Sequence, residues 1–203
     1  MTVASSDPLT IDDIVDARAY ERERSEFRAR VIALKKLRRV AVGPVVTLVF
    51  ENRETIRFQV QEMARAEKLY TDEAIEIELD TYNPLISRPG RLSASLFIEL
   101  TSREEMERWL PKLVGVERSV QLVIGELDEA EPIRCDVDEF HQTHLSREEV
   151  TAAVHFVNFS LNPDQVARME RERVALVLDH PDYRERSTLS EGTKSALLED
   201  LLG

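Results

Sequence analysis

The sequence predicts an α+β fold, with an antiparallel or mixed sheet of about five strands and helices packed mainly on one face. Runs rich in β-branched and aromatic residues recur along the chain and are typical of strands. Amphipathic segments with capping residues lie between these runs in an irregular order. Residues 119–137 hold two expected strands with no helix between them, which argues against a doubly wound parallel sheet.

The first part of the chain predicts an arm followed by a long helical segment. Residues 1–9 read as a flexible N-terminal arm, and residues 10–203 as a single α+β domain. Thr10 and the two aspartates that follow Ile11 suit a helix start. The Thr10 hydroxyl can accept from free N–H groups of the first turn, and the two carboxylates oppose the positive end of the helix dipole. Apolar spacing then predicts helix over residues 11–37, as one helix or two.

The next segment predicts a bend, a buried strand and a helix. Gly43-Pro44 marks a bend, a turn or an edge position, because proline lacks the donor that a central strand needs. Val45–Phe50 is rich in valine and predicts a buried strand. Asn52 is a suitable cap for a helix that continues to about Leu69.

The remaining elements follow from caps, prolines and β-branched runs. Two Ser-x-x-Glu capping boxes occur, and Asn-Pro pairs mark one helix end and one helix start. The expected helices are 72–79, 102–109, 164–172 and 190–202, and the expected strands are 92–100, 119–125, 133–137, 152–161 and 174–178.

Composition restricts the classes of function. The net charge of −12 disfavours binding to nucleic acid and to anionic membranes, which depends on accumulated Lys and Arg. The basic run between Arg28 and Arg39 suits an acidic protein partner at least as well as nucleic acid. No secretory signal and no membrane span is visible, and a single cysteine, Cys135, suits a reducing compartment. We therefore expect a cytoplasmic protein.

Four segments together resemble a known family. They are RRVAVGPVVTLVFENRETIRFQVQEMARAE (38–67), YNPLI (82–86), LSASLFIEL (92–100) and AVHFVNFSL (153–161). In these segments the chain resembles the bacterial family catalogued as domain of unknown function 3501. The resemblance implies no activity. It implies a genomic context of rubrerythrin-like proteins and iron–sulfur proteins of the heterodisulfide-reductase-related type, and hence such proteins as partners.

The strand-to-helix junction after Phe50 is the first candidate site. Its candidate ligand-binding residues are Glu51, Asn52, Arg57, Gln61, Glu62 and Arg65. Free N–H groups at a helix start favour a ligand there, and two arginines on one stripe can clamp a carboxylate or phosphate. The competing interpretation is a solvated helix face with ion pairs at i,i+4 spacing.

Three histidines are candidate metal ligands, namely His141, His144 and His155. The first two follow Cys135 and several carboxylates, and His-x-x-His can place two imidazoles on one side of a turn for zinc, iron or manganese. An acidic surface loop is the commoner outcome for such a segment. A single cysteine cannot hold an iron–sulfur cluster, so a partner would have to supply one.

His155 lies within an apolar strand and shares its face with Val157 and Phe159. If that face points inward, His155 needs a polar partner, and Glu51 or Glu62 could provide it.

Signatures of serine hydrolases, P-loop proteins and dinucleotide-binding enzymes are missing from the sequence. The leading hypothesis is therefore a non-catalytic accessory protein of a cytoplasmic redox or peroxide-stress system. A metal-dependent enzyme or metal-binding protein is the alternative.

Overall fold

The structure, a computed structural model, describes residues 6–126, 130–137 and 150–203. Within these ranges the strands form two antiparallel sheets. The first sheet has the order β1 (Arg39–Val42), β2 (Val46–Glu51), β3 (Arg91–Ile98), β7 (Val154–Ser160) and β6 (Asp136–Val137). The second has the order β5 (Ile133–Arg134), β4 (Val120–Ile124), β8 (Val174–His180) and β9 (Tyr183–Thr188).

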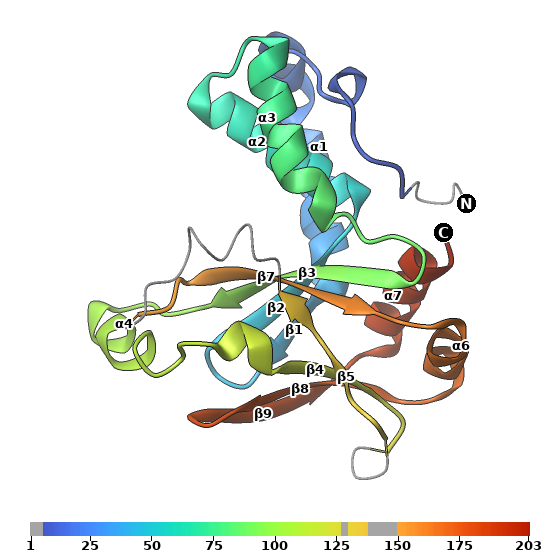
Figure 1. Ribbon diagram of the computed structural model, residues 1–203. Helices are drawn as coiled ribbons and strands as arrows, with labels where there is room; N and C mark the ends of the chain where they lie inside the picture. The colour runs from blue at the N-terminus through green and yellow to red at the C-terminus, as the bar shows by residue number, and fades with distance from the viewer. Residues whose placement is uncertain (1–5, 127–129, 138–149) are drawn as a thin grey trace.

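The helices are placed around these sheets (Figure 1). They are α1 (Ala17–Arg38), α2 (Arg53–Glu67), α3 (Asp72–Tyr82), α4 (Arg103–Trp109), α6 (Pro163–Arg171) and α7 (Glu191–Leu202), with short 3-10 turns η1 (Ile11–Asp13), η2 (Asn83–Leu85) and η3 (Val116–Ser119). The α+β class is therefore confirmed, with strands divided between two sheets where the sequence predicted one. No helix in the described ranges combines the length and apolar character needed to cross a membrane.

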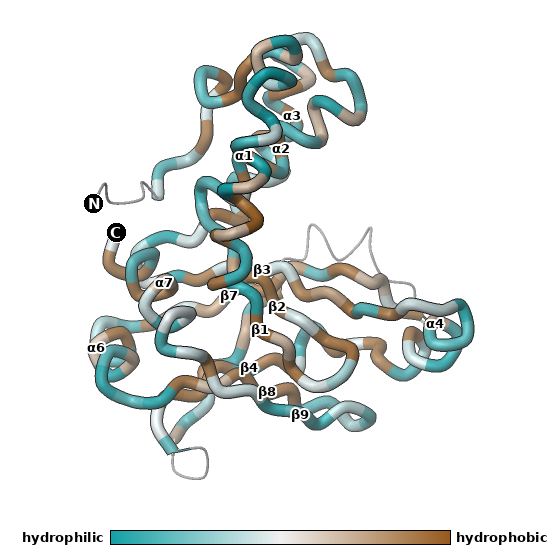
Figure 2. Tube along the Cα trace, turned by 180° about the vertical axis from the view of Figure 1, so that it is seen from behind, coloured by the Kyte–Doolittle hydropathy of each residue, from teal (hydrophilic) through white to brown (hydrophobic). Residues whose placement is uncertain are grey.

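The main core lies between the two sheets. Alternation along β2 directs Val46, Leu48 and Phe50 into this core, together with side chains from the second sheet such as Leu122 and Leu176. We call this side of the first sheet its inner face and the opposite side its outer face. Figure 2 shows hydrophobic residues concentrated in the strands and hydrophilic residues along much of α1.

The turn predicted at Gly43-Pro44 joins β1 to β2 in a hairpin whose register pairs Val42 with Val46. Tyr183 on β9 holds this hairpin to the second sheet. Its hydroxyl donates to the Val42 carbonyl at 2.7 Å and accepts from the Val45 N–H at 3.1 Å. One side chain thus links the two sheets at this edge.

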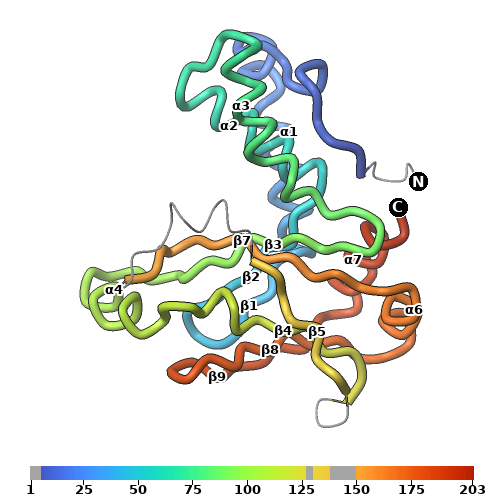
Figure 3. Tube along the Cα trace, in the orientation of Figure 1, coloured from blue at the N-terminus to red at the C-terminus, as the bar shows by residue number. Residues whose placement is uncertain are grey.

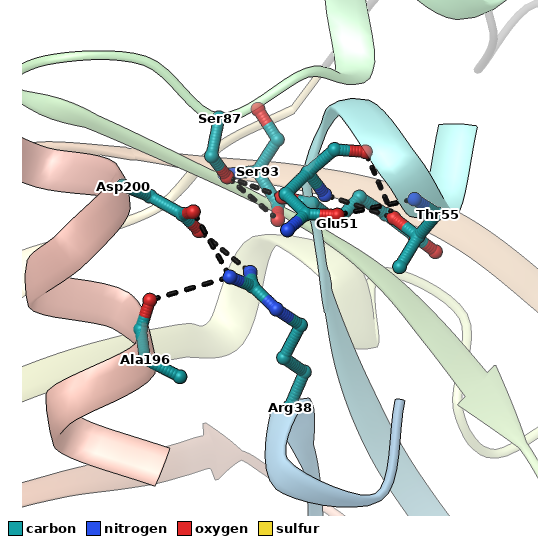
Figure 4. Close-up of polar contacts among 8 residues, drawn as sticks. Arg38, Glu51, Thr55, Ser87, Ser93, Ala196 and Asp200 are labelled. Carbon is teal, nitrogen blue, oxygen red and sulfur yellow. Dashed lines mark hydrogen bonds and ion pairs between the residues drawn. The ribbon is translucent and has the colours of Figure 1, made fainter. Parts of the chain in front are cut away.

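Helices α1, α2 and α3 form a projection that we call the helical arm, which stands on the outer face of the first sheet (Figure 1). The C-terminal end of α1, which leads into β1, packs against α7 near the end of the chain (Figure 3). There Arg38 donates two hydrogen bonds to the Asp200 carboxylate, at 2.6 and 2.9 Å, and one to the Ala196 carbonyl (Figure 4).

The structure differs from the expectations at several element boundaries. Residues 11–37 divide into η1 and α1, separated by residues 14–16, the last of which, Asp16, caps α1 by accepting from two backbone N–H groups. Residues 133–137 divide between the two sheets at Cys135. Leu9, expected in a flexible arm, is buried and exchanges two hydrogen bonds with the Asn83 side chain.

Candidate functional site at Glu51

The outer face of the first sheet carries small polar side chains under the base of the helical arm. Register places Glu51 opposite Ser93, and Ser93 opposite Asn158, so these three residues share that face. Ser95 follows two residues later on the same face. All four side chains belong to buried residues, although strand faces that are buried usually carry apolar groups.

The end of β2 is held in place by the Ser87 hydroxyl, which bonds to the backbone of two strands. The Ser87 hydroxyl donates to the Glu51 carbonyl at 2.6 Å and accepts from the Ser93 N–H at 2.9 Å (Figure 4). Directly after β2, the Asn52 side chain accepts from the Thr55 N–H at 3.1 Å and caps α2. Strand end and helix start therefore fix the backbone on both sides of the Glu51 side chain.

A cavity of about 240 Å³ opens beside Glu51. It lies where α1, α2 and the end of α3 cross the outer face of the first sheet. Its lining residues are Lys35, Glu51, Ile56, Gln59, Tyr82, Leu85, Ser95, Phe97, Val154 and Phe156. We call this cavity the Glu51 pocket.

The Glu51 carboxylate is buried, with its side chain 5% exposed. One oxygen accepts from the Ser95 hydroxyl at 2.7 Å. The other, Oε2, receives no hydrogen bond from any described residue, and the Lys35 Nζ lies 3.8 Å away. A buried oxygen with unused acceptor capacity, held in place beside a cavity, is suited to bind a donor from a ligand.

The charge balance explains why this arrangement adds little to stability. A pair about 4 Å apart gains about 4 kcal/mol at an effective dielectric constant of about 20. Burying one carboxylate costs several kcal/mol, so the two contributions nearly cancel. The ion pair therefore contributes little to folding, and Oε2 makes no hydrogen bond with a described residue.

The other candidate residues on α2 hold the N-terminal segment and α1 in place. Gln61 exchanges hydrogen bonds with the backbone N–H and carbonyl of Val15 at 3.1 and 2.9 Å. Arg57 donates to the Asp13 carbonyl at 2.9 Å. Arg65 pairs with Glu21. A ligand role for these side chains stays a prediction, and their observed contacts are with the protein itself.

Glu62 belongs to the same scaffold. Its carboxylate accepts two hydrogen bonds from Arg24, at 2.8 and 2.7 Å, and one from the Tyr20 hydroxyl at 2.5 Å. The bidentate contact with Arg24 holds the pKa of Glu62 below its usual value, and burial raises the pKa of Tyr20. This cluster joins α1 to α2.

His155 lies on the inner face, so the expected pairing with Glu51 or Glu62 is wrong. Register places His155 opposite Leu96, a core residue, whereas Glu51 is opposite Ser93 on the outer face. The carboxylate near His155 is that of Glu117, 4.0 Å from Nδ1. Burial lowers the pKa of His155. The expectation that His155 shares a buried face with Val157 and Phe159 is confirmed.

The described residues contain no preformed cluster of metal ligands. Among them, no group of three or more His, Cys, Asp or Glu side chains is placed to hold an ion. His141 and His144 lie outside the described residues. Binding of zinc, iron or manganese stays a prediction.

Sequence reasoning found Glu51 but missed the rest of the pocket. The signal for Ser95 and Phe97 was present, because alternation in LSASLFIEL places both on the face opposite the leucines. Lys35 carried no such signal, since only the packing of α1 across the sheet brings it to Glu51.

Together, the two facing sheets and the helical arm define an α+β protein with a candidate ligand pocket at a strand-to-helix junction. The chain belongs to the family described as protein of unknown function (DUF3501), whose model matches residues 8–201. The resemblance inferred from the sequence is thereby confirmed.

A solved structure supports the same relationship. A crystal structure of a novel protein of unknown function from Burkholderia pseudomallei K96243 matches with a TM-score of 0.86 and 34% identity. The match covers 96% of this chain and 100% of that one. A comparison with curated proteins found no match. The likeness therefore extends over the whole fold and brings no activity with it.

Proposed function

We propose that this chain is a non-catalytic accessory protein that binds a small ligand in the Glu51 pocket. The observation that carries this proposal is the buried Glu51 carboxylate, which belongs to the lining of a cavity of about 240 Å³ and whose Oε2 receives no hydrogen bond from any described residue. Retaining a buried charge with unused hydrogen-bonding capacity costs stability, and such costs are typical of binding sites.

The polar clusters elsewhere support a binding role over a catalytic one. The cluster of Glu62, Arg24 and Tyr20 joins two helices, and the pair of Arg38 and Asp200 joins α1 to α7. These contacts use side chains that acid–base chemistry would otherwise employ. In the Glu51 pocket the two titratable groups, Glu51 and Lys35, pair with each other, whereas catalysis would need such groups to converge on a reacting atom of a substrate.

The resemblance to the family supports a redox setting for this accessory role. It implies cytoplasmic partners of two kinds, an iron–sulfur protein and a rubrerythrin-like protein. The chain has one cysteine, so any cluster in such an assembly would reside in a partner. Affinity purification from a native host should recover at least one of these proteins, and recovery of neither would contradict this setting.

Metal binding is the second candidate, favoured by one observation. The Nδ1 of His155 is buried, receives no hydrogen bond from the described residues and lies 4.0 Å from the Glu117 carboxylate. Elemental analysis of untagged protein is the test. Stoichiometric zinc, iron or manganese that is lost in a His155→Ala variant would support this candidate, and metal-free protein without a thermal shift on metal addition would exclude it.

Crystallographic fragment soaking tests the pocket itself. Soaking wild-type crystals with a mixed set of small polar fragments should give density within hydrogen-bonding distance of Glu51 Oε2. The matched control is Glu99→Gln, because Glu99 is a carboxylate directly after β3 of the same sheet and is already bonded to Thr47 and Arg39. Fragments that bind only outside the pocket would contradict the proposal.

A further inference from the structure

We propose that the Glu51 pocket takes a small, flat, uncharged molecule that presents an N–H donor beside a carbonyl acceptor. This is the chemistry of a lactam-bearing aromatic heterocycle. The inference rests on the proposed function and names the chemical class of the ligand. It follows from the charges in the pocket, the spacing of two polar atoms and the composition of the walls.

The charges favour a neutral ligand. Glu51 and Lys35 carry opposite charges, with Nζ 3.8 Å from Oε2. A cation bound at Glu51 would be repelled by the nearby ammonium, and an anion bound at Lys35 would be repelled by the carboxylate. A neutral molecule with a donor and an acceptor satisfies both groups without either repulsion.

The spacing favours a donor and an acceptor on neighbouring ligand atoms. Glu51 supplies an acceptor and Lys35 a donor, and the two are 3.8 Å apart. Hydrogen bonds of about 2.9 Å from both groups converge on ligand atoms that lie close together. A lactam offers this arrangement, because its N–H and carbonyl are adjacent and point the same way. The Ser95 hydroxyl, 2.7 Å from the other carboxylate oxygen, keeps Oε2 oriented.

The walls favour a flat apolar body. Phe97, Phe156 and Tyr82 line the pocket together with aliphatic side chains. Aromatic side chains stack on flat rings or meet them edge-on, and both contacts stabilise a bound heterocycle. An apolar cavity of about 150 Å³ holds benzene. A pocket of about 240 Å³ therefore has room for one ring or a fused pair.

The experiment is isothermal titration calorimetry with a panel of simple probes. The lactam probes are 2-pyridone and hypoxanthine. N-methyl-2-pyridone lacks the donor but keeps the shape, benzamidine is a flat cation, and benzoate is a flat anion. Binding of the lactam probes is expected to weaken about tenfold or more on N-methylation or in Glu51→Leu, because a hydrogen bond to a charged group is lost.

Two further variants separate binding from folding. Lys35→Met changes a side chain that is 31% exposed, so this variant should fold normally. It should still lower the affinity for the lactam probes. Glu99→Gln should leave their affinity unchanged.

The outcomes distinguish the two levels of the proposal. Benzamidine or benzoate binding that depends on Glu51, without binding of the lactam probes, would overturn the ligand class and keep the proposed function. No binding by any probe would overturn both. Equal affinity for 2-pyridone and its N-methyl derivative would overturn the donor–acceptor argument.

Discussion

Removing the Asp200 carboxylate should destabilise the protein strongly. Arg38 and Asp200 are 3% and 4% exposed and share two hydrogen bonds, at 2.6 and 2.9 Å. An Asp200→Ala variant leaves the Arg38 guanidinium buried, with the Ala196 carbonyl as an acceptor (Figure 4). Breaking one side of a buried ion pair costs about 3–5 kcal/mol. For a chain of this size, that corresponds to a fall in Tm of about 6–20 °C.

Urea titration followed by circular dichroism measures this change. The matched control is Asp179→Ala, because Asp179 pairs with Arg184 at 3.5 Å while both side chains are more than half exposed. Its effect should be below about 1 kcal/mol. The double variant Arg38→Met, Asp200→Leu should recover most of the loss, since it removes both charges. A loss below about 1 kcal/mol in Asp200→Ala would refute the reasoning.

Three further predictions concern titration, reactivity and backbone geometry. Arg24 lowers the pKa of Glu62, so Glu62 contributes stability above about pH 4.3 that is lost as the pH falls through the lowered pKa. Urea titrations of Glu62→Gln should show a loss of about 1–3 kcal/mol at pH 7 that shrinks as the pH falls below the usual pKa of a glutamate, and a pH-independent loss would contradict this. Burial raises the pKa of Cys135 to about 11, so at pH 8 iodoacetamide should react about a hundredfold more slowly with folded than with unfolded protein, and equal rates would refute it. Gly43 has a φ of +74°, and a Cβ there would lie 2.5 Å from the Tyr183 hydroxyl. Gly43→Ala should therefore lower the free energy of unfolding by more than about 1 kcal/mol in thermal unfolding, whereas at an unstrained site the same substitution would raise it.

The local elements could be predicted where caps and turns define them. The Asn52 cap, the turn at Gly43 and the strand Val154–Ser160 all follow from residue types at fixed offsets. Strand β9, YRERST, could not be found in this way. Four of its six residues are exposed and it carries charges along its length, so no apolar alternation marks it as a strand. Missing this edge strand concealed the second sheet.

The candidate site could be predicted in part. Glu51 is the last residue of a buried strand and lies just before a capped helix, and this position identified it. Its neighbours depend on how α1 crosses the sheet, which no local pattern encodes. Polar character alone was a poor guide on α2. Gln61 and Glu62 were candidate ligand-binding residues for that reason, but their contacts attach α1 and the segment before it to α2.

The most direct test of a ligand site at Glu51 is mass spectrometry of the small molecules that co-purify with the protein from a native host. Wild-type protein and Glu99→Gln should carry the same small molecule, released on denaturation. In Glu51→Leu and Lys35→Met it should be depleted about tenfold or more, because each variant removes one side of the polar pair beside the pocket. An identical small-molecule content in all four proteins would contradict a binding role for this pocket.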